Sequence, residues 1–400
     1  MKKTSSAPWS SAWLVALLVA LAFTACATEP SAEAPGQAEA PSQEASAAET
    51  ATEATPRAKF EPPDGSILVF AGQSNDAVGG HDEHRSGYVD HFGTPAGFSH
   101  YVGFLEDVDT PLGYRMDAGR IEGLTTWDYW GAGPMCLECY LKEPAFEKTV
   151  VHLALSMEGG SCERLANGAA TNEDEPNLDE LAAFMQKYSH FAFLLRPGYE
   201  FDGEWNGYPA AEYKIAFRRI IDHLRAAEVT NFATVFASSK PNLPRETWEA
   251  YYPGDEYVDW LGYSWWAPAR EEDAEEGAPE LPSVAAELAR EWQKPILMAE
   301  VGPRHYRTGK DETEKVWAWY ASLFEHIEEY SDVVKGLAII NNHWDPEPMW
   351  KDGDWGDFRL ENDPVIAERW REKVMSAPFV HTTEGTYELI GFKHESLAKN

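Results

Sequence analysis

The chain has 400 residues and a formal net charge of −34, from 33 Lys and Arg against 67 Asp and Glu. A phosphate backbone would be repelled by this charge, so nucleic acid is excluded as a partner, and solubility is a sufficient reason for the acidity. The 16 Trp residues exceed what one core of this size needs. Because fully buried Trp is uncommon, some of them are expected on a binding surface.

The first residues are typical of an export signal. Lys2-Lys3 precedes an apolar run, residues 13–23, that is too short to span a bilayer. The run leads to Thr24-Ala25-Cys26, which resembles a bacterial lipobox, where the cysteine becomes the lipidated N-terminus. We expect residues 1–25 to be a signal peptide and the exported protein to be a lipoprotein held at a membrane, periplasmic or at the cell surface, through Cys26. Ordinary cleavage that leaves Cys26 an incidental thiol is the alternative.

The next segment has the composition of a tether. Residues 27–57 contain no aromatic or large aliphatic side chain and consist almost wholly of Ala, Glu, Pro, Ser, Thr, Gln and Gly. Such a segment cannot bury a core. We therefore expect residues 26–58 to be a lipidated N-terminus with a disordered linker, and residues 59–400 to form one folded domain.

Within this domain, eight short β-branched or aromatic segments alternate with longer segments of helical period. Strands are expected at residues 67–71, 97–102, 150–157, 191–196, 232–237, 258–264, 295–300 and 336–341. Helices are expected at residues 178–188, 210–227, 284–292, 312–330 and 364–375. This alternation predicts the α/β class and a (β/α)8 TIM barrel. The tail at residues 387–392 is expected to pack beneath the barrel.

Three cysteines fall inside the predicted barrel: Cys136, Cys139 and Cys162. The Cys136-x-x-Cys139 pair could contribute to a zinc site, but no second CxxC and no spaced His pair completes one. In an exported protein we expect a disulfide among the three, and the sequence leaves the pairing open.

Two glutamates stand where a barrel carries its active site, at the carboxyl ends of strands. Glu200 follows the fourth predicted strand and Glu300 ends the seventh, within the segments LLRPGYEFDGEWNGY and KPILMAEVGP. Each arrives on an apolar strand, where an unused charge would be costly. Glycoside hydrolysis needs an acid for the leaving oxygen and a carboxylate on the other side of the sugar, about 5 to 5.5 Å apart in retaining enzymes. Solvated loop charge is the alternative for two glutamates in so acidic a chain.

These segments resemble glycoside hydrolase family 26, whose (β/α)8 retaining enzymes include β-mannanases and β-1,3-xylanases. The family's acid/base glutamate follows an Arg-Pro pair and precedes Gly-x-Trp, so the resemblance implies this role for Glu200, with Arg196 and Trp205 beside it. The family's nucleophile closes a Lys-Pro-hydrophobic strand, which implies Glu300. Further matches are ILVFAGQSNDAVGG, PAGFSHY, WGAGP, YYPGDEYVDWLGYSWW, and NNHWD followed by WGDFR. The resemblance implies no metal and no organic cofactor, because such enzymes work with carboxylates alone.

The sequence departs from the mannanase pattern of the family. Tyr199 stands where mannanases usually have His, and residues 204–208 replace an aromatic-rich stretch. This version resembles the β-1,3-xylanase branch and weakens mannan as the substrate. A Tyr near the end of the sixth strand often contacts the family's nucleophile, and the nearest matches here are Tyr263 and Trp265.

The expected partner is therefore a β-linked polysaccharide of the β-1,3-xylan or β-mannan type, cleaved by endo action by a monomer. The substrate-binding residues are expected to be Arg196, Tyr199, Asp202, Trp205, Tyr208, Tyr263, Trp265, Trp130 and Trp344. Indole rings stack on the C–H faces of pyranoses. Of the aromatic group Trp130, Trp205, Tyr208, Trp265, Trp266 and Trp344, at least two are expected in sugar subsites.

Two other functions compete with this interpretation. Gly72-Gln73-Ser74-Asn75 after the first strand matches the nucleophile block of SGNH-like carbohydrate esterases, with Ser74 as nucleophile. Those enzymes need a late Asp-x-x-His element, and His343, His381 and His394 lack that spacing. The other alternative is a non-catalytic glycan-binding lipoprotein on the same barrel, which would have no need for two acids over one bond.

Overall fold

The computed structural model describes residues 57–393, apart from residues 82, 85, 105–120, 130, 169–174, 267–282, 352 and 383–384. The expected signal peptide, the lipidation site at Cys26, most of the linker, Trp130 and His394 lie outside the described residues. Within the described part, no helix combines the length and the apolar character needed to cross a bilayer.

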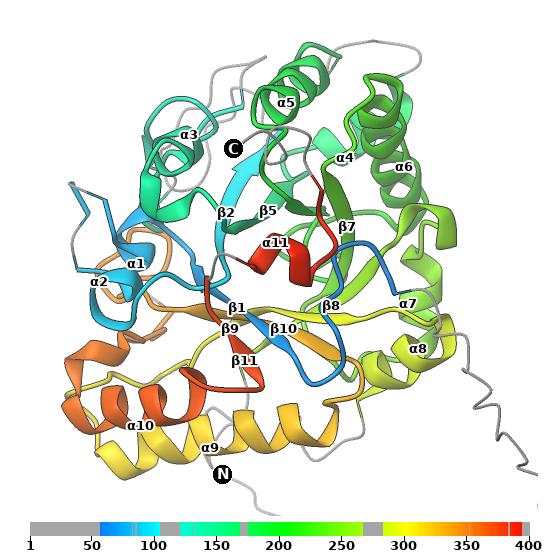
Figure 1. Ribbon diagram of the computed structural model, residues 1–400. Coiled ribbons are helices and arrows are strands. Elements are labelled where there is room, and N and C mark those ends of the chain that lie inside the picture. The colour runs from blue at the N-terminus through cyan, green and yellow to red at the C-terminus, as the bar shows by residue number, and fades with distance from the viewer. Residues whose placement is uncertain are drawn as a thin grey trace, which may run out of the picture. The chain divides into compact units, whose positions relative to one another are not determined.

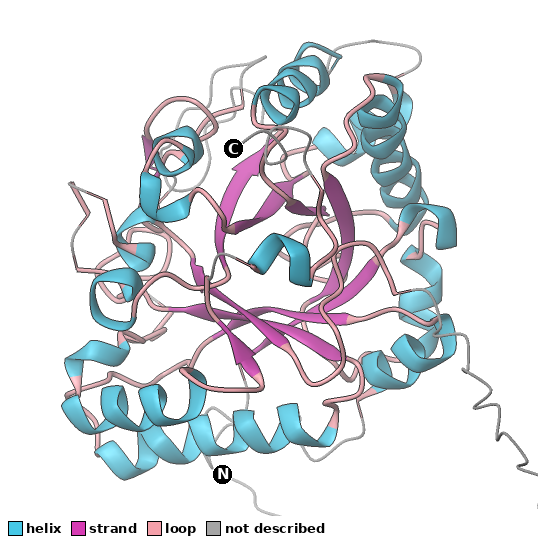
Figure 2. Ribbon diagram, in the orientation of Figure 1, coloured by secondary structure: helices cyan, strands magenta, loops and turns pink. Residues whose placement is uncertain are grey.

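A ring of parallel strands forms the centre of the domain (Figures 1 and 2). The strands are β1 (Ile67–Gly72), β2 (Gly97–Gly103), β5 (Val150–Ser156), β6 (Phe193–Pro197), β7 (Phe232–Ser238), β8 (Trp260–Trp265), β9 (Ile296–Val301) and β10 (Val334–Ile340). The ring closes because β10 pairs with β1, with Leu68 opposite Gly336. The predicted (β/α)8 barrel is confirmed, with each of the eight expected strands within a few residues of its observed position.

Helices cover the outside of this ring (Figure 2). The longer ones are α5 (Glu175–Lys187), α6 (Ala210–Ala226), α8 (Val284–Trp292), α9 (Thr313–Glu329) and α10 (Pro364–Val374), all at predicted positions. The shorter ones are α1 (Asn75–Val78), α2 (Tyr88–Phe92), α3 (Leu137–Leu141), α4 (Ser161–Asn167) and α7 (Arg245–Tyr251). On α6 the buried side chains Tyr213, Phe217, Ile220 and Leu224 recur at steps of three or four, so they form one stripe against the strands.

Most hydrophobic side chains of the strands belong to one of two clusters, one outside the ring and one inside it. On β6, Phe193 and Leu195 belong to the large cluster that includes the covering helices, whereas Leu194 belongs to the cluster inside the ring. The inner cluster also contains Phe60, Tyr387, Ile390 and Phe392. The C-terminal tail therefore closes the amino end of the barrel, as predicted.

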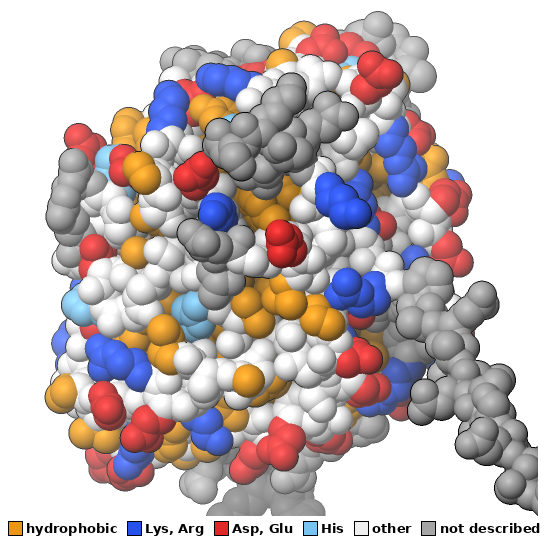
Figure 3. Space-filling view, in the orientation of Figure 1, with side chains coloured by type: hydrophobic (Ala, Val, Ile, Leu, Met, Phe, Trp, Pro, Cys, Tyr) orange, Lys and Arg blue, Asp and Glu red, His pale blue; other side chains and the backbone are white. Residues whose placement is uncertain are grey.

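The tail is visible at the front of the ring in Figure 1, where α11 (Thr386–Leu389) lies across it. Beside it, β11 (Phe379–Val380) pairs with β1 and places Phe379 opposite Ile67. Figure 3 shows this face with hydrophobic side chains near its middle and charged side chains of both signs around them.

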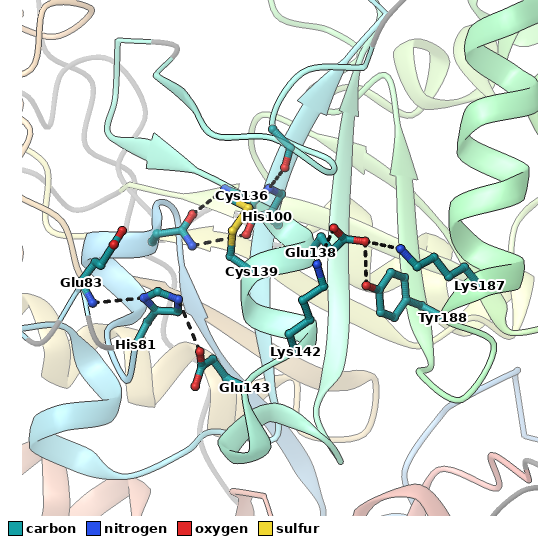
Figure 4. Close-up of a disulfide and its surroundings, with 12 residues drawn as sticks. His81, Glu83, His100, Cys136, Glu138, Cys139, Lys142, Glu143, Lys187 and Tyr188 are labelled. Atoms are coloured by element: carbon teal, nitrogen blue, oxygen red, sulfur yellow. Dashed lines mark hydrogen bonds and ion pairs between the residues drawn. A yellow bond between two sulfur atoms is a disulfide. The ribbon is translucent and has the colours of Figure 1, made fainter.

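The predicted disulfide joins Cys136 to Cys139, at the start of α3, with their Cα atoms 5.4 Å apart, and Cys162 is a buried free thiol. Figure 4 shows the carboxylate of Glu138, between the two cysteines, bonded to Lys142, Lys187 and Tyr188. Lys187 is on α5, so the disulfide turn is tied to a neighbouring helix.

Candidate active site

Both predicted carboxylates lie at the carboxyl-end side of the barrel, within its interior. Glu300 is on β9 and is 6% exposed, and Glu200 comes three residues after β6 and is 8% exposed. Buried carboxylates need specific partners, because water no longer solvates them. The partners of the two glutamates differ in kind.

Glu300 reaches the interior through an irregularity in its strand. Tyr263 pairs with Met298 and the next residue, Ser264, pairs with Glu300, so Ala299 is an extra residue in β9. Such a β-bulge re-aims the side chain that follows it. Without it, the alternation from the inward Leu297 would turn the Glu300 side chain toward the helices.

Arg196 is the charged partner of Glu300. Its Nη1 donates to Glu300 Oε1 at 2.7 Å, and the arginine side chain is fully buried. Burial alone would lower the pKa of Arg196, but the charges of Glu300 and Glu200, the hydrogen bond to Glu300 and the nearby Tyr101 together outweigh this effect, and the pKa is raised. The pair therefore consists of a guanidinium cation against a carboxylate, and removing either partner would leave an uncompensated buried charge.

Tyr101 is a second, neutral partner of Glu300. It lies in one lateral row with Ala154 and Arg196, because β2 pairs with β5 and β5 with β6 at these positions. Its hydroxyl interacts with Glu300, and burial, together with the charge of Glu300, raises the pKa of Tyr101 well above its usual value. The phenol therefore stays protonated and can donate to the carboxylate.

Glu200 is held in a left-handed backbone conformation, with φ of 50°. Ser264 Oγ donates to Glu200 Oε1 at 2.5 Å and Trp205 Nε1 donates to Oε2 at 3.1 Å. Asn206 Nδ2 donates to the backbone carbonyl oxygens of Tyr199 and Glu200, at 2.9 Å each, and so fixes the turn. This conformation is uncommon outside glycine and is maintained by these surrounding bonds.

The electrostatic setting of Glu200 favours its protonated form. Burial and the negative charge of Glu300 raise the pKa of Glu200 to about 8, against the opposing effects of Arg196 and the Ser264 hydroxyl. Two neighbouring carboxyls in unequal environments can serve as one acid and one carboxylate at the same pH. Ser264 connects them, since it is paired with Glu300 in the sheet and bonded to Glu200.

Two of the expected substrate contacts lie beside this pair and retain exposed surface. The ring of Tyr199 is half-buried, with the Arg196 guanidinium 5.3 Å from its centre and the Tyr101 ring at 5.5 Å. Trp205 is 67% exposed apart from its bond to Glu200. Trp266, from the aromatic group expected to supply sugar subsites, is also half-buried, and it lies against Gly302, two residues after Glu300.

The structure corrects several other expectations about binding residues. Tyr208 is buried and its hydroxyl accepts from the backbone of Met157. Tyr263 and Trp265 point to the outer face of β8, where Tyr263 bonds to His326 at 2.8 Å and Trp265 packs on the same imidazole. Period-two alternation places both on the helix side, so neither points toward Glu300, and the tyrosine that interacts with Glu300 is Tyr101.

Three further expected residues are buried or engaged with protein. Arg196 has no exposed surface and binds Glu300. Asp202 accepts from the backbone and hydroxyl of Ser239, at 2.7 and 2.5 Å. Trp344 lies within an aromatic cluster with Phe358 and three other Trp residues and is buried. Arg196 and Trp344 therefore offer no surface to a ligand, whereas Asp202 is half-buried.

The esterase alternative does not fit the position of Ser74. Its hydroxyl accepts from the backbone of Ala77 as the N-cap of α1 and from Asn342 Nδ2, both at 3.3 Å. The side chain is 1% exposed, and among the bonds of the described residues it has no histidine partner. Ser74 is therefore a structural residue of the turn after β1.

Comparison with known proteins places this geometry in context. The model of glycosyl hydrolase family 26 matches residues 70–344. A β-1,3-xylanase of a Vibrio species is 27% identical over 357 residues, covering 82% of this chain and 69% of that protein. A β-1,3-xylanase of an Alcaligenes species is 26% identical over 360 residues, covering 82% and 68%. Among solved structures, a family 26 β-mannanase from Bacteroides ovatus shares the fold, with a TM-score of 0.53 at 17% identity over 83% of this chain and 94% of that chain.

Proposed function

The chain belongs to glycosyl hydrolase family 26, and from this premise we propose that it cleaves a β-linked polysaccharide with retention of configuration, with Glu200 as acid/base and Glu300 as nucleophile. The observation that carries the proposal is that two buried, neighbouring carboxyl groups have different bonding partners. Glu300 is bonded to a cation, whereas the donors to the Glu200 carboxyl among the described residues are neutral and its pKa is raised.

The first chemical step follows from this difference. Protonated Glu200 gives its proton to the glycosidic oxygen as the C–O bond breaks, and a carboxylate oxygen of Glu300 forms a bond to the anomeric carbon. The leaving sugar departs as an alcohol, and an ester links the remaining sugar to the enzyme. Arg196 and Tyr101 hold Glu300 so that its attacking oxygen is oriented before substrate arrives.

The second step reverses the proton transfer. Glu200, now a carboxylate, takes a proton from water, and the resulting hydroxide attacks the anomeric carbon and releases Glu300. Each step inverts the configuration, so the product retains that of the substrate. Ser264 and Trp205 donate to Glu200, and these bonds stabilise its charged form during this half of the cycle.

We propose β-1,3-xylan as the polysaccharide, attacked within the chain. The support is Tyr199 at the position before the acid/base and the similarity to two proteins named β-1,3-xylanases. Tyr199 packs over Arg196 and Tyr101, so a phenol forms part of the surface next to both glutamates. Sites that hydrogen-bond particular hydroxyls discriminate strongly between sugars.

The test is a reducing-end assay on β-1,3-xylan, β-mannan, β-1,4-xylan and β-1,3/1,4-glucan. We expect the highest kcat/KM on β-1,3-xylan and a mixture of oligosaccharides early in the reaction, as endo action produces. A higher kcat/KM on mannan oligosaccharides than on β-1,3-xylo-oligosaccharides would overturn the substrate assignment and leave the two-glutamate mechanism to be tested separately.

For the N-terminal segment, we propose export and anchoring through lipid on Cys26, on the strength of its lipobox-like setting. The protein is expected in the membrane fraction, and Cys26→Ser is expected to release it without changing kcat or KM. Recovery of the wild type wholly in the soluble fraction would contradict the anchor.

A further inference from the structure

The most exposed aromatic side chains of the described residues are Trp127 and Tyr129, each 43% exposed, and Trp205. The other well-exposed large hydrophobic residues, Ile215, Val365 and Met375, are aliphatic and lie on α6 or at α10. Trp127 and Tyr129, here called the rim pair, belong to a segment between β2 and α3 that has no part in the catalytic step.

The rim pair stands at the same end of the barrel as the two glutamates. Tyr129 is in β3 (Asp128–Tyr129), which forms a hairpin with β4 (Pro134–Met135). Met135 packs against Tyr101 of the site, and the carbonyl oxygen of Ala132 accepts from Asn342, two residues after β10. The hairpin is thus fixed over the carboxyl ends of β10, β1 and β2.

Trp205 is on the opposite side of the ring. It lies in the segment that follows β6, and this segment is tied to the end of β7 by the bonds from Ser239 to Asp202. In the strand order, β6 and β7 are opposite β10 and β1. A chain molecule that contacts both Trp205 and the rim pair therefore crosses the end of the barrel, where Glu200 and Glu300 lie.

The rim pair is held in place by neighbouring polar groups. The His84 ring lies 4.9 Å from Trp127 and the His81 ring 6.1 Å from it. Figure 4 shows His81 bonded to Glu83 and paired with Glu143, with 3.4 Å between Nε2 and Oε1. Packing against these two histidines limits the freedom of the Trp127 side chain, which reduces the entropy cost of binding.

Tyr129 is fixed in a corresponding way, because its hydroxyl donates to the carboxylate of Glu347. Burial, together with the nearby charge of Asp76, raises the pKa of Glu347. Asp76 is also paired with His84. Three carboxyls therefore lie next to the rim pair or to the histidines beside it, those of Glu347, Asp76 and Glu143, and they would disfavour a uronate or sulfated sugar.

We propose that Trp127 and Tyr129 form a distal subsite that stacks on an uncharged sugar unit of the polysaccharide, away from the bond that is cleaved. This inference rests on the proposed function for the catalytic step and adds a recognition site to it. Aromatic faces suit the C–H faces of neutral pyranoses, and the acidic surroundings disfavour anionic ones.

The test is the dependence of kcat/KM on chain length, with a ladder of neutral oligosaccharides from the polymer that the wild type hydrolyses best. Trp127→Ala and Tyr129→Ala are expected to lower kcat/KM about tenfold for the longest oligosaccharides, through KM. The shortest hydrolysed oligosaccharide is expected to be unaffected. Trp127→Phe keeps an aromatic face and is expected to retain most of the length dependence. Ile215→Ala, at a similarly exposed position on α6, is the matched control.

Equal length dependence in Trp127→Ala, Tyr129→Ala and the wild type would overturn the subsite while leaving the proposed hydrolysis intact. Failure of the proposed function is seen separately, as a wild type that hydrolyses no member of the glycan panel. Affinity electrophoresis in gels containing neutral β-glycan then gives a second readout, in which the two alanine variants are expected to be retarded less than the wild type. If a carboxylated glycan retarded the wild type as much as the neutral β-glycan does, the restriction to uncharged sugars would be overturned.

Discussion

The two ends of the barrel interior are made by the same strands and have opposite chemistry. On β6, Leu194 lies in the apolar inner cluster, and Arg196, two residues later, is bonded to Glu300. At the amino end, the tail residues Tyr387 and Phe392 complete a core of hydrophobic side chains, and the Tyr387 hydroxyl donates to the backbone carbonyl oxygen of Thr149. At the carboxyl end, Arg196, Glu200 and Glu300 are buried, and each has a charged or hydrogen-bonding partner. The amino end thus supplies stability, and the carboxyl end holds reactive groups that stability alone would not select.

This comparison predicts that substitutions at the two ends separate activity from stability. Removing the proposed nucleophile is expected to give the largest effect. Glu300→Gln is expected to lower kcat about 10⁵-fold on every substrate, because no covalent intermediate can form. Glu300→Ala should do the same. Both variants leave the buried Arg196 without its counterion, so Tm is expected to fall in both, and further in Glu300→Ala, which also loses the hydrogen bond. Steady-state kinetics with thermal melting measure both quantities, and near-normal polysaccharide hydrolysis by either variant would remove Glu300 from the mechanism.

The next largest effect is expected for the acid/base. Glu200→Ala is expected to lower kcat about 10³-fold on polysaccharide and far less on aryl glycosides with activated leaving groups, which need little protonation. Azide should partly restore turnover by taking the place of the deprotonated water, and the product should be a β-configured glycosyl azide. An equal loss on both kinds of substrate would contradict the assigned role.

A smaller loss of rate is expected where a polar partner of the nucleophile is removed. Tyr101→Phe deletes the hydroxyl that interacts with Glu300 and keeps the ring that packs on Tyr199. We expect kcat to fall about 10- to 100-fold with KM little changed, since a polar interaction with a charged group is lost. Tyr320→Phe, at a buried tyrosine on α9, is the control. A loss expressed mainly in KM would indicate a substrate contact instead of a positioning role.

Removing a hydrogen-bond partner of Glu200 is expected to shift the pH profile more than it lowers the maximal rate. Its pKa is raised to about 8 and the acid acts when protonated, so kcat/KM is expected to fall as the pH rises through this value. Ser264 donates to the charged form, and Ser264→Ala should therefore raise the pKa further and move the falling limb about one pH unit upward. Ser322→Ala on α9 is the control. A downward movement of the limb in Ser264→Ala would contradict this reading of the site.

The smallest effect on catalysis is expected at the amino end. Leu194→Ala creates a cavity in the inner cluster and is expected to lower the free energy of unfolding by about 2 to 5 kcal/mol. Because Leu194 does not contact the glutamates, kcat per folded molecule should stay near the wild-type value. Chemical denaturation and active-site titration measure the two quantities, and a large fall in kcat would show that the two ends are not independent.

Much of the fold could be predicted from the sequence because it follows from local patterns. The strands and long helices have strong periodicity, and Glu200 and Glu300 were placed correctly at strand ends. Alternation along β8 also contains the signal for Ser264, since Tyr263 and Trp265 on either side of it must face the other way. The same reasoning applies to Tyr101, which ends an inward-facing row with Ser99 on β2.

The remaining features depend on tertiary structure and could not be predicted. The extra residue at Ala299 is visible only once β9 is paired with β8, and it decides which way Glu300 points. The left-handed conformation of Glu200 is maintained by Asn206, through bonds that no local preference indicates. The burial of Tyr208 and Trp344 likewise depends on which neighbours the fold supplies, so an aromatic residue near a strand end did not by itself indicate a binding surface.

The most direct test of the account is the site of covalent attachment. Incubation with a 2-deoxy-2-fluoro-β-xylo-oligosyl fluoride is expected to form a stable ester, because the fluoride leaves without protonation and the 2-fluoro group slows hydrolysis of the intermediate. Peptide mass spectrometry should find the added mass on Glu300 in the wild type, with none in Glu300→Gln. Attachment to Glu200 or to Ser74, or turnover through an inverted product with no attached sugar, would contradict the assignment of Glu300 as the nucleophile.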